Sequence, residues 1–329
     1  MHCPHSVLRV LALLSLSVCP MLLSAQVEVR HAGDKISITI DGKHESDFFL
    51  ASPKPFLHPL RSASGKIVSR MYPMEEREGE MKDHIHHQGL WYTHEAVNGF
   101  DFWGNHPSFR ANRGDKLGIV DLVKVNETKS GKNNGLLGAT FAWKSPSGEL
   151  LLEENRRMVF HKRPNLRIID VDVELVAKTD VTFGDTKEGT FAIRTAPEFE
   201  LPSPKRPSTP ARTGRMVNSN GVEGVAIWGK RASWVDYSAM VDGEKLGIAI
   251  FDHPKNPRHP TYWHARDYGL FAVNPFGVHD FENNKELDGS LKLANGEKVR
   301  FRYRVVIHSG DEKEGNVDAL YKEYTRSVR

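Results

Sequence analysis

The sequence predicts an all-β protein, built as one large antiparallel β-sandwich with a single C-terminal helix. Short runs of alternating apolar and polar residues recur along the chain, and turns rich in Gly, Asn, Asp and Pro separate them. Many strands at such spacing are typical of sandwiches. A helical pattern is convincing only over residues 316–327. We therefore expect stacked sheets and almost no helix outside that segment.

Residues 1–25 have the plan of a secretory signal peptide. Arg9 is followed by an apolar run over residues 10–23, and two small residues then precede an expected cleavage before Gln26. This arrangement predicts an exported protein, either periplasmic or secreted.

Residues 26–329 are expected to form one domain without any thiol, because both cysteines, Cys3 and Cys19, lie in the leader. Disulfides, thiolate zinc sites and thiol nucleophiles are therefore excluded. The full chain has 45 Lys and Arg against 42 Asp and Glu. With no basic stripe, nucleic acid is not an expected partner. No apolar run after the leader is long enough to cross a bilayer.

Strands are expected wherever the alternation holds. In the first, residues 36–40, three isoleucines share one face and the run ends at the turn pair Asp41-Gly42. Residues 150–160 and 166–176 form an expected hairpin. The other expected strands are residues 117–125, 137–143, 224–228, 246–251, 268–273 and 299–307.

A proline-rich segment, residues 197–212, interrupts the strand pattern. It carries five prolines, yet strand patterns continue on both sides of it. We read it as an ordered surface loop or lid and not as a domain linker. Three longer stretches, residues 52–112, 183–196 and 252–283, lack a clean strand pattern but are rich in reactive side chains. They are the expected functional loops, because binding groups are often placed on loops held by a rigid scaffold.

A dense histidine cluster marks the first of these stretches. Four histidines fall within eleven positions that begin at His84, and Asp83 precedes them. Imidazole titrates near neutrality and is the commonest metal ligand. If the segment is extended, His84 and His86 share one face while His87 takes the other. A polar surface loop remains the plain alternative, but the density favours an active-site or metal-site strand.

The other stretches supply carboxylates, guanidinium groups and aromatic rings. Glu188 precedes a glycine at a strand start, where it either projects into a cleft or belongs to a solvated turn. Residues 251–269 hold three histidines, three prolines and four aromatic residues, a stiff composition that suits a preorganised site. Arg61, in an apolar setting, either binds an anion or a sugar hydroxyl pair, or forms a structural salt bridge.

Four runs together resemble a known family: residues 56–61, 83–91, 98–103 and 251–269. They are similar to a family of exported bacterial proteins that is labelled "PmoA", after a methane oxygenase subunit, or left without a function. The oxygenase label does not fit, because such a subunit is a bundle of membrane-spanning helices. The resemblance implies a supersandwich similar to galactose-mutarotase-like proteins, whose last strands residues 293–301 also resemble. Members of that architecture mostly act on carbohydrate with His and carboxylate groups.

We therefore expect an exported enzyme that eliminates, hydrolyses or epimerises a sugar or glycoside. A divalent metal would favour elimination. The expected catalytic residues are His86, His87, His264, Asp267 and Glu188, the expected substrate-binding residues are Arg61, Trp91, Trp103, Arg194, Arg266 and Tyr268, and the metal ligands, if an ion is bound, are His84 and His86.

Two alternatives remain open from the residues alone. One is a non-catalytic carbohydrate-binding protein of the cell envelope, and the other is a passive scaffold with a structural metal site. The enzyme requires the His run and the 252–269 loop to meet in one cleft, whereas the alternatives do not.

Overall fold

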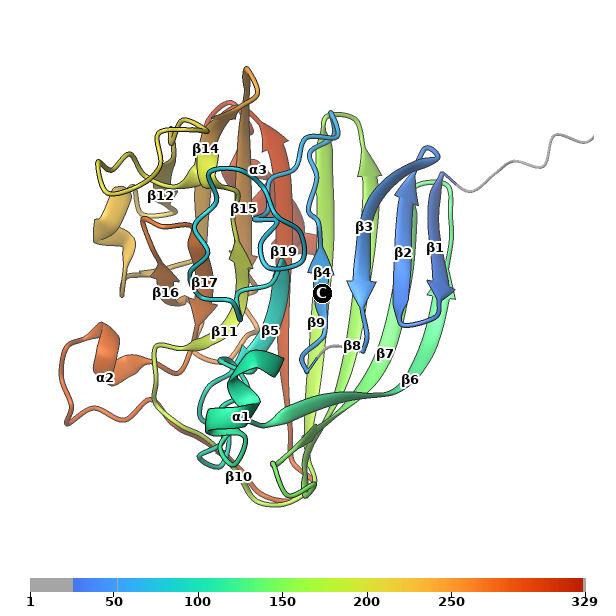
Figure 1. The fold of residues 1–329 in the computed structure, drawn as a ribbon, viewed down its shortest axis with the longest axis vertical. Helices are drawn as coiled ribbons and strands as arrows, with labels where there is room; N and C mark the ends of the chain where they lie inside the picture. The colour runs from blue at the N-terminus through green and yellow to red at the C-terminus, as the bar shows by residue number, and fades with distance from the viewer. Residues whose placement is uncertain (1–25, 52, 328–329) are drawn as a thin grey trace, which may run out of the picture.

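The computed structural model describes residues 26–51 and 53–327 and shows two large antiparallel sheets packed face to face (Figure 1). This arrangement confirms the predicted antiparallel sandwich. The expected leader, residues 1–25, lies outside the described residues. Among the described residues, no helix is long and apolar enough to span a membrane.

The first sheet has nine strands. In spatial order they are β1 (Val27–Ala32), β2 (Lys35–Ile40), β3 (Lys43–Phe49), β4 (Phe56–His58), β5 (Leu90–His94), β11 (Gly189–Arg194), β17 (Leu270–Asn274), β16 (Thr261–Ala265) and β13 (Arg231–Ala232).

The second sheet has eight strands, and a separate two-stranded sheet pairs β10 (Val181–Phe183) with β18 (Leu291–Leu293). In spatial order the eight are β12 (Arg215–Asn218), β14 (Trp234–Val241), β15 (Glu244–Asp252), β19 (Lys298–Ser309), β9 (Leu166–Ala177), β8 (Leu150–Arg163), β7 (Asn134–Lys144) and β6 (Ile119–Lys129).

The alternating runs formed strands because one of their faces lies in the core between the sheets. In β2, Ile36, Ile38 and Ile40 are buried while the residues between them are partly exposed. The β8–β9 hairpin pairs in register from Leu152 to Arg163. Its turn includes Asn165 at a positive φ, a conformation that asparagine tolerates well.

Short helices and one longer helix complete the chain. The long one, α3 (Val317–Ser327), confirms the predicted C-terminal helix and packs on the outer face of the eight-stranded sheet, where Val317 and Tyr324 join a cluster with Phe251. The short ones are η1 (Pro107–Phe109), α1 (Arg110–Arg113), η2 (Pro197–Phe199), η3 (Gly224–Ile227) and α2 (Val278–Phe281).

Two predictions about local structure are wrong. Residues 224–227 form the 3-10 helix η3 and not the strand expected over residues 224–228. The stretches that were expected to be functional loops contain β4, β5 and β16, and also β11, whose start at Gly189 was expected. Every residue of these four strands is buried. A strand buried on both faces has no reason to alternate, so its sequence shows no period of two.

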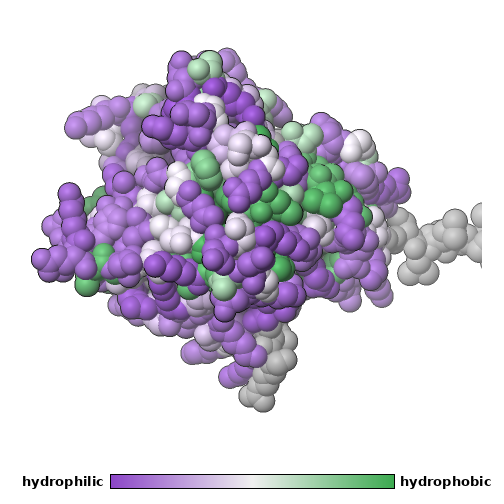
Figure 2. Space-filling view, turned by 90° about the horizontal axis from the view of Figure 1, so that it is seen from below, coloured by the Kyte–Doolittle hydropathy of each residue, from purple (hydrophilic) through white to green (hydrophobic). Residues whose placement is uncertain are grey.

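Loops cover the outer face of the nine-stranded sheet and produce this double burial. A small cluster on that face includes Trp91, Trp103, Ala192 and Ala272. The proline-rich segment folds back toward it, and Arg212 donates hydrogen bonds to carbonyl groups within that segment and to the carbonyl oxygen of Gly79. The space-filling view in Figure 2 shows a surface on which hydrophilic residues predominate and hydrophobic patches are smaller.

Candidate functional site

The His run is a turn and not an extended strand. The backbone N–H of His87 donates to the carbonyl oxygen of His84 at 2.9 Å, and His84 has a φ of +41°. The rings of His84 and His87 stack with centroids 4.8 Å apart and planes 8° apart. The expectation that these two side chains take opposite faces is therefore wrong, because the turn brings them together.

A buried arginine that the sequence did not single out holds this turn in place. The guanidinium of Arg70 donates to the carboxylate of Asp83 at 2.7 Å. It also donates to four backbone carbonyl groups, those of Met81, Asp83, His84 and His87, at 2.9 to 3.2 Å. Because a guanidinium has five N–H donors in a fixed plane, one side chain can fix the path of the whole run.

Asp83 is the carboxylate at the centre of the site. One of its oxygens accepts from Arg70 and from Nη2 of Arg194 at 2.8 Å, and the other lies 3.0 Å from Nδ1 of His84. Burial alone would raise the pKa of Asp83, but the His84 hydrogen bond and the two arginine charges lower it well below its usual range. The ionised carboxylate accepts from Nδ1 of His84, so in the neutral ring the lone pair is on Nε2.

The imidazoles that we expected to be catalytic are held neutral. Burial is the main cause in each case: it lowers the pKa of His86 to about 2, that of His264 to about 3, and that of His87 well below 6.5. Nδ1 of His264 lies 2.9 Å from the carbonyl oxygen of Lys187. These three rings are neutral near pH 7 and can donate or accept hydrogen bonds.

His87 and His264 lie on the same face of the nine-stranded sheet without facing each other. Trp91, Ala192, Ala272 and His264 are aligned across β5, β11, β17 and β16. Three strand spacings separate the ends of this row by roughly 14 Å. His87 stacks on Trp91 with centroids 5.3 Å apart. The two alanines thus lie in the row between Trp91, on which His87 stacks, and His264.

Tyr268 is the residue through which the two distant stretches meet. Its ring stacks on His84 with centroids 5.2 Å apart and planes 5° apart. The guanidinium carbons of Arg194 and Arg266 lie 4.8 and 5.5 Å from the centre of the same ring. Burial raises the pKa of Tyr268 to about 12. His84, between His87 and Tyr268, is thus the middle ring of a stack of three.

An open hollow lies beside this stack. It has a volume of about 290 Å³ and is lined by Val225, Trp228, Ala265, Arg266 and Asp267. Within the part of the chain that the structure describes, the Arg266 guanidinium has no hydrogen bond or ion pair. Asp267 is already occupied, because its carboxylate accepts from Nη2 of Arg206 at 2.7 Å.

Glu188 is a partly exposed carboxylate whose pKa is raised above its ordinary value. Its side chain is 28% exposed and lies 3.5 Å from the ammonium group of Lys187. Burial raises its pKa, and the nearby charge of Glu95 acts in the same direction. The charge of His84 acts on Glu188, which places the two groups within electrostatic range of each other.

Lys54 is the second residue that the sequence reasoning missed. Its side chain is fully buried, its Nζ donates to the carbonyl oxygen of Trp103 at 2.6 Å, and it lies 5.3 Å from the centre of the Trp91 ring. Burial lowers its pKa to about 7. A lysine between two prolines, directly before β4, is the signal that could have drawn attention to it.

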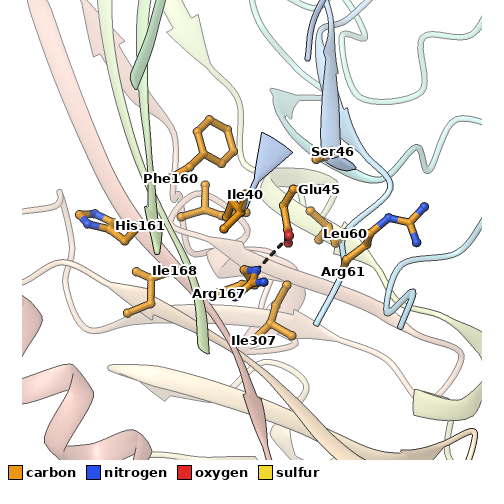
Figure 3. Close-up of a pocket in the computed structure, with 11 residues that line it drawn as sticks. Ile40, Glu45, Ser46, Leu60, Arg61, Phe160, His161, Arg167, Ile168 and Ile307 are labelled. Atoms are coloured by element: carbon orange, nitrogen blue, oxygen red, sulfur yellow. Dashed lines mark hydrogen bonds and ion pairs between the residues drawn. The ribbon is translucent and has the colours of Figure 1, made fainter. Parts of the chain in front are cut away.

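Arg61 lies away from this group of residues. It lines a separate cavity between the sheets, where Glu45 and Arg167 form an ion pair at 2.9 Å (Figure 3). That cavity measures about 10 Å³, room for about one water molecule and too small for a sugar. The Arg61 guanidinium donates to the carbonyl oxygen of Gly65 at 3.2 Å.

The expected metal ligands do not form a ligand set. Among residues 26–51 and 53–327, no group of three or more His, Cys, Asp or Glu is arranged to hold a metal ion. His84 and His86 have ring centroids 5.9 Å apart, and Nδ1 of His84 is directed at Asp83.

Comparisons with known proteins identify a family but no activity. A family model described as a family of unknown function, DUF6807, matches residues 35–322, and its description does not carry the methane oxygenase label. A search of curated proteins found no match.

Solved structures with similar folds include a galactose mutarotase-like protein from Clostridium acetobutylicum, with 10% identity over 87% of this chain and 99% of that one and a TM-score of 0.44. Another is a galactose 1-epimerase from Lactobacillus acidophilus, with 10% identity over 87% and 100% of the two chains and a TM-score of 0.40. At these values the similarities do not bear on activity.

Proposed function

The chain belongs to DUF6807, a family of unknown function, and from its site we propose that it is a carbohydrate-active enzyme that works by acid–base catalysis. The observation that carries the proposal is the position of His84. Its ring is stacked between His87 and Tyr268, its Nδ1 is held by Asp83, and its side chain is 42% exposed. It is thus the imidazole of the run that a ligand can reach.

His84 and Glu188 divide the proton transfers between them in this proposal. Asp83 stays ionised and orients His84, which leaves Nε2 as the base. Glu188, whose pKa burial raises, is the matching acid. Two titratable groups with different environments in one site are the usual equipment of acid–base catalysis. Elimination, hydrolysis and epimerisation all need such a pair.

A sugar suits the hollow beside Arg266. The Arg266 guanidinium, which makes no hydrogen bond within the described residues, can bind two hydroxyl groups at once. The hollow of about 290 Å³ is near the lower limit of small-molecule sites, which suits a single sugar residue. Trp228 lines the same hollow and supplies an aromatic surface.

The test compares His84→Ala and Glu188→Gln with His31→Ala, a surface histidine outside the site. Turnover is followed by NMR on a panel of aldoses, uronic acids and their glycosides. We expect each site variant to lose at least about 100-fold in kcat, as for a lost general acid or base. His31→Ala should keep full activity. Folded site variants that retain full turnover would refute the assignment.

The neutral, buried state of His86, His87 and His264 favours a second candidate, a carbohydrate-binding protein without catalysis. Neutral imidazole rings such as these can bind a ligand through hydrogen bonds without taking part in a reaction. In that case the wild-type protein binds a sugar from the same panel without converting it, and His84→Ala weakens binding.

A further inference from the structure

A second group of side chains, which we call the donor cluster, lies directly behind the His84 stack. It consists of Lys54, His87, Trp91 and Trp103. The Trp91 and Trp103 rings are 5.0 Å apart, and the His87 ring is 5.3 Å from the first and 5.9 Å from the second. Nζ of Lys54 lies 5.3 Å from the Trp91 ring. All four side chains are buried.

The donor cluster has more N–H groups than acceptors. Nε2 of His87 and Nε1 of both tryptophans are buried and lack hydrogen-bond partners in the structure. Lys54 has three N–H bonds and one acceptor, the carbonyl oxygen of Trp103. Buried polar atoms nearly always have hydrogen-bond partners, so several unpartnered donors packed together indicate that an acceptor belongs there.

The chemistry of each group shows that all of them donate. Indole nitrogen and ammonium can only donate. The tautomer of His87 follows from its contact with Arg194. Nη1 of Arg194 lies 3.1 Å from Nδ1 of His87, and because a guanidinium can only donate, Nδ1 must accept. Neutral His87 therefore carries its proton on Nε2. A ligand group that accepts hydrogen bonds and donates none, as an anionic oxygen does, therefore matches the chemistry of these donors.

The nearest carboxylate of the protein does not fill this role. Asp101 acts on the charge of Lys54 from a distance, but its oxygens accept from the backbone N–H of Gly104 at 2.6 Å and from Arg113 at 2.7 Å. Lys54 is the single cation of the donor cluster, so its charge balances one carboxylate better than a doubly charged phosphate.

We propose that the donor cluster binds the carboxylate of the ligand, and that the substrates are acidic sugars of the uronic acid class. This inference rests on the proposed carbohydrate function and adds a substrate class to it. Burial lowers the pKa of Lys54 to about 7, and a bound carboxylate would restore its charge.

The outer side of the donor cluster offers a route for the ligand. His86 covers it, with its ring 4.4 Å from that of His87 and 6.1 Å from that of Phe109 in η1. Neither η1 nor α1 buries a single residue, so this cover is weakly packed. A ligand that enters on this side would have to displace His86 and Phe109, which belong to neither sheet.

The test measures the affinities of glucuronate, glucose and formate by calorimetry at constant ionic strength, with chloride as the balancing anion. In the wild-type protein we expect glucuronate to bind at least ten times more tightly than glucose, and formate to compete with glucuronate. Lys54→Met should remove this preference and leave glucose binding in place. Trp103→Phe should reduce the preference, while Trp234→Phe, whose indole is hydrogen-bonded to Asp318 elsewhere, should not.

The outcomes separate this inference from the proposed function. If formate binds in a Lys54-dependent way but no sugar binds, the donor cluster is an anion site and the carbohydrate proposal fails. If wild-type protein binds glucose and glucuronate equally and ignores formate, the donor cluster inference is overturned while the carbohydrate proposal stands. A preference for glucuronate that survives in folded Lys54→Met overturns it as well.

Discussion

Replacing Lys54 with methionine should stabilise the protein. Burial lowers the pKa of this lysine from its ordinary 10.5 to about 7. This fall of about 3.5 in the pKa corresponds to about 5 kcal/mol by which the buried lysine destabilises the folded protein at neutral pH. The variant loses the hydrogen bond to the carbonyl oxygen of Trp103, which lowers its stability by about 1–3 kcal/mol. The methionine side chain has a similar length, so we expect a net gain of about 2–4 kcal/mol at pH 7.

The pH dependence of this gain identifies its cause. The pKa of Lys54 is lower in the folded than in the unfolded state, so the unfolded chain binds more protons between about pH 7 and pH 10. The wild-type protein therefore recovers stability as pH rises through this window. Urea denaturation at pH 7 and pH 10 should show the advantage of Lys54→Met shrinking at the higher pH. An equal or less stable variant at pH 7 would refute the reasoning.

Two further substitutions and one measurement on the native protein test other parts of the chain. His308→Ala should cost about 3–5 kcal/mol in urea denaturation, because it leaves the fully buried Asp236 without the partner that lies 2.7 Å away; a loss below about 1 kcal/mol would contradict this. Arg70→Met should abolish turnover and speed amide hydrogen exchange over residues 81–87, because five hydrogen bonds disappear; unchanged exchange would show that the turn holds itself. We also propose export: protein from the native host should begin near Gln26, and an intact Met1 in the cytosol would contradict the leader.

The strands that alternate were predictable, and the strands that carry the site were not. β2, β8 and β9 bury one face, so their sequences show a period of two. β5 and β11 bury both faces and show no such period, although a strand start was expected at Gly189. The prediction for residues 224–228 was wrong in the opposite sense: the apolar residues suggested a strand, but residues 224–227 form η3.

The sequence identified the His run as a candidate site but could not assign roles within it. The role of each imidazole depends on a partner far away in the chain. Arg194 decides which nitrogen of His87 carries the proton, across 107 positions. His84 was expected only as a metal ligand; its neighbour Asp83 orients it, and Tyr268, far away in the chain, stacks on its ring. No local pattern encodes the pairings with Arg194 and Tyr268.

The covering that hid the central strands also creates the electrostatic character of the site. By burying the outer face of the nine-stranded sheet, the loops remove Lys54, Arg70 and Arg194 from water. Asp83 and Glu80 act on the charge of Arg70, and Asp101 acts on that of Lys54. Charges interact strongly in such a region of low dielectric. Because the oxygens of Asp101 accept hydrogen bonds from Gly104 and Arg113, a carboxylate brought by a ligand would supply the acceptor that the buried donors lack.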